Sequence, residues 1–116
     1  MLIKACREVS ATQRSIQQKT QAVLNRMLDK AQTYIEAEQY LLAEQMYEAY
    51  IARCEDNFAR ADAEIKKLAV CVLAGDKERA TNQLNTLVGK MRSGEYVLNA
   101  EQKQSLAESK LGIMRL

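Results

Sequence analysis

The three cysteines are the strongest candidate nucleophiles and metal ligands of this chain, which contains no histidine. Cys6, Cys54 and Cys71 form no Cys-x-x-Cys element, and three thiols without a histidine would be an unusual zinc site. The absence of histidine also removes the commonest general base and every Ser–His or Cys–His nucleophile pair. An odd number of cysteines does not favour a secreted disulfide framework. We therefore expect reduced structural thiols in a non-enzymatic, cytoplasmic protein without a metal site.

Glu44 and Glu48 are two carboxylates that share one face of a helix, because four residues separate them. Helical di-metal centres usually add a Glu-x-x-His motif from each of two further helices, and this chain cannot supply one. Its glycines are isolated from one another, so no phosphate loop is present in the sequence either. The pair is expected to form a solvated or partner-facing acidic patch, and no cofactor is expected.

Basic residues suggest an alternative function in nucleic-acid binding. The net charge is only +2, but residues 1–30 hold six basic and two acidic side chains, 31–65 hold two and eight, and 66–116 hold nine and five. The candidate basic patch comprises Lys4, Arg7, Arg14, Lys66, Lys67, Lys77 and Arg79. Such residues could contact phosphates. The small net charge and the concentration of tyrosines in the acidic middle of the chain make this the alternative rather than the leading function.

The elements that carry these residues are predicted to be helices throughout. The chain has no proline and its first glycine is Gly75, so few residues disfavour a helix before that point. An apolar stripe with spacings of four and three residues marks one side of a helix, and it consists of Tyr47, Ile51, Cys54, Phe58, Ala61, Ile65, Leu68 and Val72. We predict an all-α helical bundle in a single domain, 1–116, with a long antiparallel helical hairpin and two shorter helices, over about 2–36, 39–74, 77–92 and 99–112.

The boundaries of these helices rest on local signals. An earlier stripe that starts at Leu2 is out of phase with the one from Tyr47, which indicates either a reversal of the chain near 36–41 or one continuous helix; the length of a continuous helix favours the reversal. A break at 54–57 is the open alternative within the second helix, with Asn57 in a left-handed conformation. Gly75 is expected to end that helix, and Asp76 and Asn99 are expected to cap the next two helices.

The first helix has a polar interruption in its stripe. Gln13 and Thr20 occupy seam positions, so this stretch is either a solvated part of the helix or a polar seam of a coiled coil that fixes register. The acid-poor start of the chain also resembles a mitochondrial presequence, but the periodicity that continues past residue 30 favours a place in the fold. No stretch is long and apolar enough for a membrane span. The apolar residues 112–116 are expected to fold back onto the bundle or to dock elsewhere.

Two segments resemble the second helix of a tetratricopeptide unit. EQYLLAEQMYEAY has Tyr40, Ala43 and Tyr47 at the expected spacing, and AGDKERATNQLNTL has Ala80 and Leu84 likewise. The segments lie 37 residues apart, whereas that family uses about 34. The first segment also lacks the turn glycine, so we assign no membership of the family.

Protein–protein interaction is the leading function by this reasoning. Long helices present faces to other helices, and tyrosines are common in interface cores. The candidate partner-binding residues are Ile16, Tyr34, Tyr40, Leu41, Glu44, Tyr47, Glu48 and Tyr50. The other interpretation of the tyrosines is that they cover the core of the domain itself. We expect an adaptor, assembly factor, chaperone or inhibitor whose partner is a protein, with a homodimer as the simplest case and no small-molecule substrate.

Overall fold

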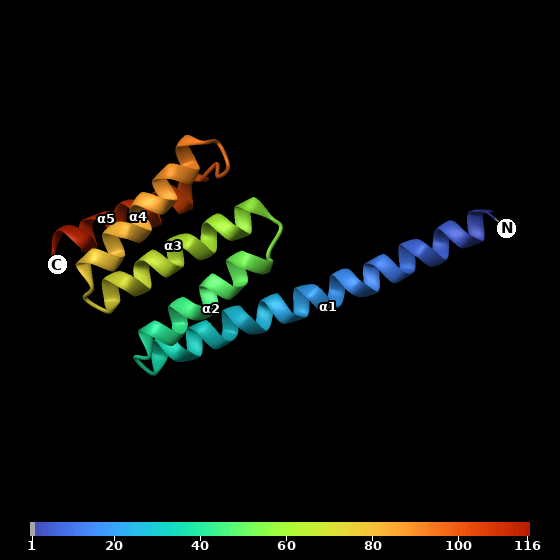
Figure 1. The fold of residues 1–116 in the computed structure, drawn as a ribbon, viewed down its shortest axis with the longest axis horizontal. Coiled ribbons are helices and arrows are strands. Elements are labelled where there is room, and N and C mark those ends of the chain that lie inside the picture. The colour runs from blue at the N-terminus through green and yellow to red at the C-terminus, as the bar shows by residue number, and fades with distance from the viewer. Residues whose placement is uncertain (1) are drawn as a thin grey trace.

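The computed structural model describes the backbone of residues 2–116 and the side chains of residues 19–116. It contains five helices and no strand within that backbone (Figure 1), which confirms the all-α prediction. The helices are α1 (Leu2–Glu36), α2 (Tyr40–Arg53), α3 (Asn57–Leu73), α4 (Lys77–Arg92) and α5 (Ala100–Met114).

The predicted reversal between the first two helices is confirmed, and it is made without glycine. Glu38 has a φ of 58°, in the left-handed region that L-residues other than Asn and Asp seldom adopt. The Gln39 backbone N–H donates to the Tyr34 carbonyl at 2.8 Å, which closes the end of α1. Gln39 provides no side-chain cap for α2, so this turn is held by backbone hydrogen bonds.

The prediction of one helix over 39–74 is wrong, because the chain breaks at Cys54–Asp56. Cys54 is extended, with a ψ of 130°, and the Asp56 side chain accepts a hydrogen bond from the Phe58 N–H at 3.1 Å. An aspartate in this position is a strong start signal for a helix. Asn57 therefore begins α3 instead of ending α2 in a left-handed conformation.

The break also divides the apolar stripe between two cores. Tyr47 and Cys54 belong to a cluster between α1, α2 and α3, whereas Ile65 and Leu68 belong to a cluster between α3, α4 and α5. Phe58, at the middle of the stripe, is 50% exposed. The stripe therefore does not form one continuous seam.

The remaining predicted helix boundaries agree well with the structure. Gly75 has a φ of 75°, and the Asp76 side chain accepts a hydrogen bond from the Arg79 N–H at 3.1 Å. Asn99 and Gln102 form the predicted capping box. The last helix continues to Met114, with Ile113 buried and the tail after it exposed, so most of the expected folding back of 112–116 is not observed.

The helices repeat with a period of 37 residues. Glu36 and Leu73 end α1 and α3 at this interval, and Tyr40 and Lys77 begin α2 and α4 at the same interval. Buried residues recur at the same interval of 37 residues, in the pairs Ala31 and Leu68, Ala43 and Ala80, and Tyr50 and Leu87. The chain is therefore a helical hairpin of α1 and α2, a second hairpin of α3 and α4, and a fifth helix. This repeat accounts for the 37-residue separation of the two similar sequence segments.

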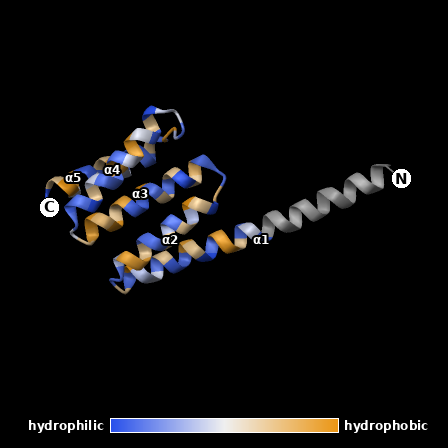
Figure 2. Ribbon diagram, in the orientation of Figure 1, coloured by the Kyte–Doolittle hydropathy of each residue, from blue (hydrophilic) through white to orange (hydrophobic). Residues whose placement is uncertain are grey.

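Helix α3 is the centre of the arrangement (Figure 1), since it packs against α2, α4 and α5. Ala63 and Val70 face the first core cluster, and Ala61, Leu68 and Cys71 face the second. Hydrophobic and hydrophilic residues alternate along the coloured parts of the helices (Figure 2), as expected for helices with one buried side. Within the part of the chain whose side chains are described, no helix is long and apolar enough to cross a membrane.

Candidate interaction surfaces

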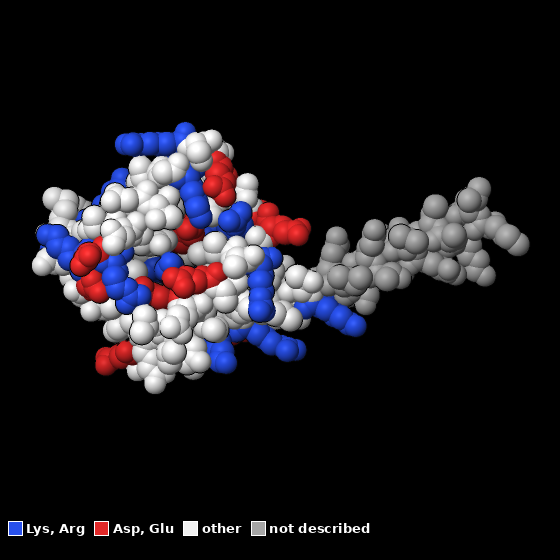
Figure 3. All heavy atoms as spheres, viewed as in Figure 1, with Lys and Arg blue, Asp and Glu red and all other residues white. Residues whose placement is uncertain are grey.

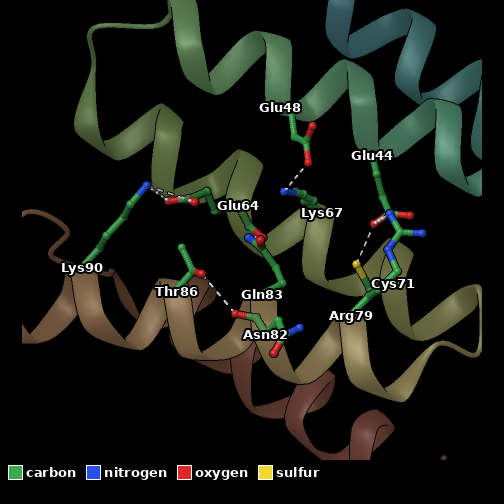
Figure 4. Close-up of polar contacts among 10 residues, drawn as sticks. All are labelled: Glu44, Glu48, Glu64, Lys67, Cys71, Arg79, Asn82, Gln83, Thr86 and Lys90. Carbon is green, nitrogen blue, oxygen red and sulfur yellow. Dashed lines mark hydrogen bonds and ion pairs between the residues drawn. The ribbon is translucent and has the colours of Figure 1, made fainter.

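A polar groove of about 200 Å³ lies between α2 and α4, with α3 as its floor (Figure 4). Its walls carry both acidic and basic side chains, which gather at the centre of the face in Figure 3. The lining residues are Glu44, Glu48, Lys67, Cys71, Arg79, Asn82, Gln83 and Thr86. This groove contains members of both the predicted acidic patch and the predicted basic patch.

Glu44 is a buried carboxylate in the polar groove, with only 2% of its surface exposed. Its Oε1 accepts hydrogen bonds from Arg79 Nη2 at 2.7 Å and from Cys71 Sγ at 2.9 Å. Its Oε2 is buried without a partner among the described residues. The prediction of a solvated or partner-facing carboxylate is thus wrong for Glu44, because an arginine 35 residues further along the chain pairs with it.

The thiol of Cys71 is unsuited to nucleophilic chemistry in this environment. Burial, and then the hydrogen bond to Glu44, raise the pKa of the Cys71 thiol to about 12. The thiol is therefore protonated at neutral pH, whereas thiolate is the nucleophilic form. Cys54 is also buried and free, and Cys6 lies outside the described side chains.

Two further ion pairs connect neighbouring helices, the first in the polar groove and the second beside it (Figure 4). Lys67 Nζ lies 2.9 Å from Glu48 Oε1, and Lys90 Nζ lies 3.2 Å from both oxygens of Glu64. The amide of Gln83 donates to the backbone carbonyl of Glu64 at 3.2 Å. The charged side chains that line the groove thus pair with one another, Glu44 with Arg79 and Glu48 with Lys67.

Tyr96, which sequence reasoning did not single out, closes one end of this network. It is 2% exposed, and its ring lies 5.4 Å from Lys90 Nζ and 6.0 Å from the Arg60 guanidinium carbon. Burial raises the pKa of the Tyr96 phenol. These cation–π contacts fix the segment that connects α4 to α5.

The predicted basic patch is not one surface among the described residues. Lys67 and Arg79 are paired with Glu48 and Glu44 in the polar groove, and Lys66 pairs with Asp62 at 3.1 Å on another side of α3. Lys77 lies exposed at the start of α4. The side chains of Lys4, Arg7 and Arg14 lie outside those that the structure describes.

The predicted tyrosine surface is mostly part of the core. Tyr47 and Tyr50 are buried, and Tyr34 and Tyr40 are half-buried against the same cluster. Burial, followed by a hydrogen bond with Cys54, raises the pKa of Tyr50 to about 12. The alternative interpretation, that the tyrosines cover the core, therefore holds. Among the remaining predicted partner residues, Leu41 is 54% exposed and Ile16 lies outside the described side chains.

A second groove runs along α3 between α1 and α5, and the sequence analysis did not predict it. It consists of two adjoining cavities of about 330 and 410 Å³ that share Asp62 and Ser105. We call it the α3–α5 groove. Its apolar lining comprises Leu28, Phe58, Ala59, Ala63, Ile65, Ala69, Val72 and Leu73.

The floor of the α3–α5 groove is apolar and open to solvent at both ends. Phe58 is 50% exposed at one end, and Leu73 is 58% exposed at the other. Gly112 of α5 packs directly on Val72, which lines the groove: a Cβ added to this glycine would lie 2.7 Å from Val72 Cγ1. Close approach of the two helices thus shapes one end of the groove.

Acidic side chains rim the α3–α5 groove. Asp62 lies on α3, and Glu101 and Glu108 lie on α5. Among the described side chains, Lys66 is the one basic member of the lining, and it pairs with Asp62. The groove therefore combines an apolar floor with a net negative rim.

A helical pattern in the sequence could have indicated this surface. Asp62, Lys66, Ala69 and Leu73 follow each other at intervals of four, three and four residues, which places them on one side of α3. On α5, Leu106 is buried, whereas Leu111 is 54% exposed. The contact between α3 and α5 could not be derived from either helix alone.

The described side chains include no group of three or more His, Cys, Asp or Glu residues that could hold a metal ion. The fold and its surfaces define a class of protein: a tandem pair of helical hairpins with a fifth helix and an open apolar groove. No protein-family model, curated protein or solved structure matches the chain.

Proposed function

We propose that this chain is a non-enzymatic interaction module that binds a helical segment of a protein in the α3–α5 groove. The observation that carries the proposal is the exposed apolar floor between Phe58 and Leu73. Large apolar side chains that share one concave surface are characteristic of docking sites for amphipathic helices. An adaptor, assembly factor, chaperone or inhibitor would act through such a surface.

The chemistry of the polar groove supports a structural role for its residues. The carboxylates of Glu44 and Glu64 pair with cations of the same chain, and the Cys71 thiol is held in its protonated form. Free, buried thiols at Cys54 and Cys71 suit a reducing compartment, so we place the protein in the cytoplasm.

Nucleic-acid binding is the less favoured function. Three of the four described members of the candidate basic patch, Lys66, Lys67 and Arg79, already pair with carboxylates. Contacts with phosphates would have to replace these ion pairs.

Site-specific photo-cross-linking tests the proposed function in the full-length chain. A benzophenone amino acid would replace Leu73 in the groove, and Val97, which is 83% exposed in the α4–α5 connection, would serve as the control position. We expect a discrete protein adduct from position 73, whether with a copy of the chain or with another protein, and none from position 97. The added change Ala69→Arg should abolish this adduct, because it places a charge on the apolar floor. No adduct at position 73, or equal adducts at both positions, would contradict the proposal.

A further inference from the structure

We infer that the occupant of the α3–α5 groove is the N-terminal segment, residues 2–18 of α1, from a second copy of this chain. This inference rests on the proposed function and names the partner that the groove takes. Four features carry it: the length of α1, the apolar stripe in its sequence, the length of α3 and the charges of the segment and the groove.

Helix α1 is much longer than the helix that covers it. α1 has 35 residues and α2 has 14, which correspond to about 52 and 21 Å at about 1.5 Å per residue. Helix α2 is the main packing partner of α1, so it can cover less than half of its length. The rest of α1 needs another partner to bury its apolar residues.

An apolar stripe in the sequence of α1 extends beyond the part of the helix that α2 can cover. In the sequence, Leu2, Cys6, Val9, Ile16 and Val23 fall on one side of a helix at heptad spacing. The described part of this stripe is Val23, Met27 and Tyr34: Met27 and Tyr34 pack against the first core cluster, whereas Val23 is 41% exposed. The cover that the core gives to the stripe thus ends near Val23, and the part of the stripe before it needs another surface.

The N-terminal segment and the α3–α5 groove match in length and in charge. The 17 residues of the segment and the 17 of α3 both span about 25 Å as helices. The segment contains three basic residues, Lys4, Arg7 and Arg14, and the single acid Glu8. The groove has the opposite balance, with three acids and one lysine. Opposite charges of this kind orient a helix whose apolar side enters the groove.

The geometry of α1 requires that the segment come from another copy. α1 is a single helix from Leu2 to Glu36, so residues 2–18 continue its axis beyond α2 and do not turn back toward α5 of the same chain. Mutual exchange of the two segments between two copies fills both grooves and closes a two-fold dimer.

Charge exchange between full-length variants tests this inference. One variant carries Arg7→Glu with Arg14→Glu in the segment, and the other carries Glu101→Lys with Glu108→Lys in the groove. Each variant alone should self-associate at least about tenfold more weakly than the wild type in sedimentation equilibrium, because like charges then face each other. An equimolar mixture should recover dimers, since each segment again meets a groove of opposite charge.

Glu55→Lys with Glu78→Lys is the matched control, because it reverses two exposed acids outside the α3–α5 groove. This control should dimerise like the wild type, and circular dichroism should give all variants the same helicity. Unchanged association of either reversed variant, or a mixture that remains monomeric, would overturn the inference. A monomeric wild type at every concentration would also overturn it. In that case, an adduct between position 73 and a different protein would leave the proposed function in place.

Discussion

Glu44 on α2 and Arg79 on α4 form an ion pair of 2.7 Å that joins the two helical hairpins. The pair is asymmetric in its exposure to water: the side chain of Glu44 is 2% exposed and that of Arg79 is 42% exposed. If the partner were removed, Arg79 could recover its hydration, whereas Glu44 would remain a buried charge.

Arg79→Met should therefore destabilise the protein more than Glu44→Met does. We expect a loss of about 3 kcal/mol in the free energy of unfolding for Arg79→Met, since an unpaired carboxylate stays buried, and about 1 kcal/mol for Glu44→Met. Urea denaturation would measure both values. Lys66→Met is the control, because its pair with Asp62 is exposed and should contribute at most about 1 kcal/mol. Equal losses for the two groove variants would show that solvent reaches Glu44.

Glu38→Gly should stabilise the protein. Glu38 holds a φ of 58° and Gly75 holds a φ of 75° at the equivalent turn, 37 residues later. Glycine adopts this conformation without the steric cost of a Cβ, so the change should raise the free energy of unfolding by about 1 kcal/mol. Gly75→Ala should lower it by a similar amount. Thermal unfolding would compare the two, and a destabilised Glu38→Gly variant would contradict this account of the turn.

Alanine substitution should have opposite effects at two helical glycines. A Cβ at Gly112 would lie 2.7 Å from Val72 Cγ1, whereas a Cβ at Gly89 would meet nothing within 4 Å. Gly112→Ala should cost about 1 kcal/mol through crowding of α3 and α5, and Gly89→Ala should add up to about 1 kcal/mol through helix propensity. In a Val72→Ala background, Gly112→Ala should no longer be destabilising. Chemical denaturation of these variants tests this, and a cost of Gly112→Ala that persists in the Val72→Ala background would refute close packing as its cause.

Alkaline pH should destabilise the wild type partly through Cys71. The pKa of this thiol is about 12 in the folded protein and 9.0 without the fold. Above pH 9 the unfolded chain therefore loses the proton first, and stability falls as the pH rises from about 9 toward 12. Cys71→Ser removes this titration, so the difference in stability between wild type and variant should shrink with rising pH.

Thiol reagents provide an independent check on Cys71 at pH 8. The wild-type residue should react only after unfolding, because it is buried and protonated. Parallel stability curves for wild type and Cys71→Ser, together with rapid modification of Cys71 in the folded protein, would contradict the assigned environment.

Local signals in the sequence were sufficient for the helical class and for most helix boundaries. Helix ends and caps depend on residues that are close together in the chain. The structure confirms two such signals, the turn at Gly75 with the cap at Asp76 and the capping box of Asn99 and Gln102. The break at Cys54 was only the alternative prediction. Cys54 and Phe58 are four residues apart, which is the spacing of a helix, although residues 54–56 are not helical.

The surfaces were harder to predict, because they depend on contacts between distant segments. The acid at Glu44 and the base at Arg79 were assigned to separate patches, yet they neutralise each other across 35 residues of chain. The α3–α5 groove arises only when Gly112 lets α5 approach Val72 of α3. The spacing within α3 could indicate one face of the groove, but neither the Glu44–Arg79 pair nor the approach of Gly112 to Val72 follows from the pattern of a single helix.

Light scattering tests most directly whether copies of this chain associate through the α3–α5 groove. It would measure the mass of the protein in solution over a wide range of concentration. The monomer mass is 13.1 kDa. The account predicts that the wild type and the control Val97→Arg approach twice this mass as the concentration rises, while Ala69→Arg stays monomeric with unchanged helicity. A wild type that stays monomeric throughout, or an Ala69→Arg variant that dimerises like the wild type, would contradict it.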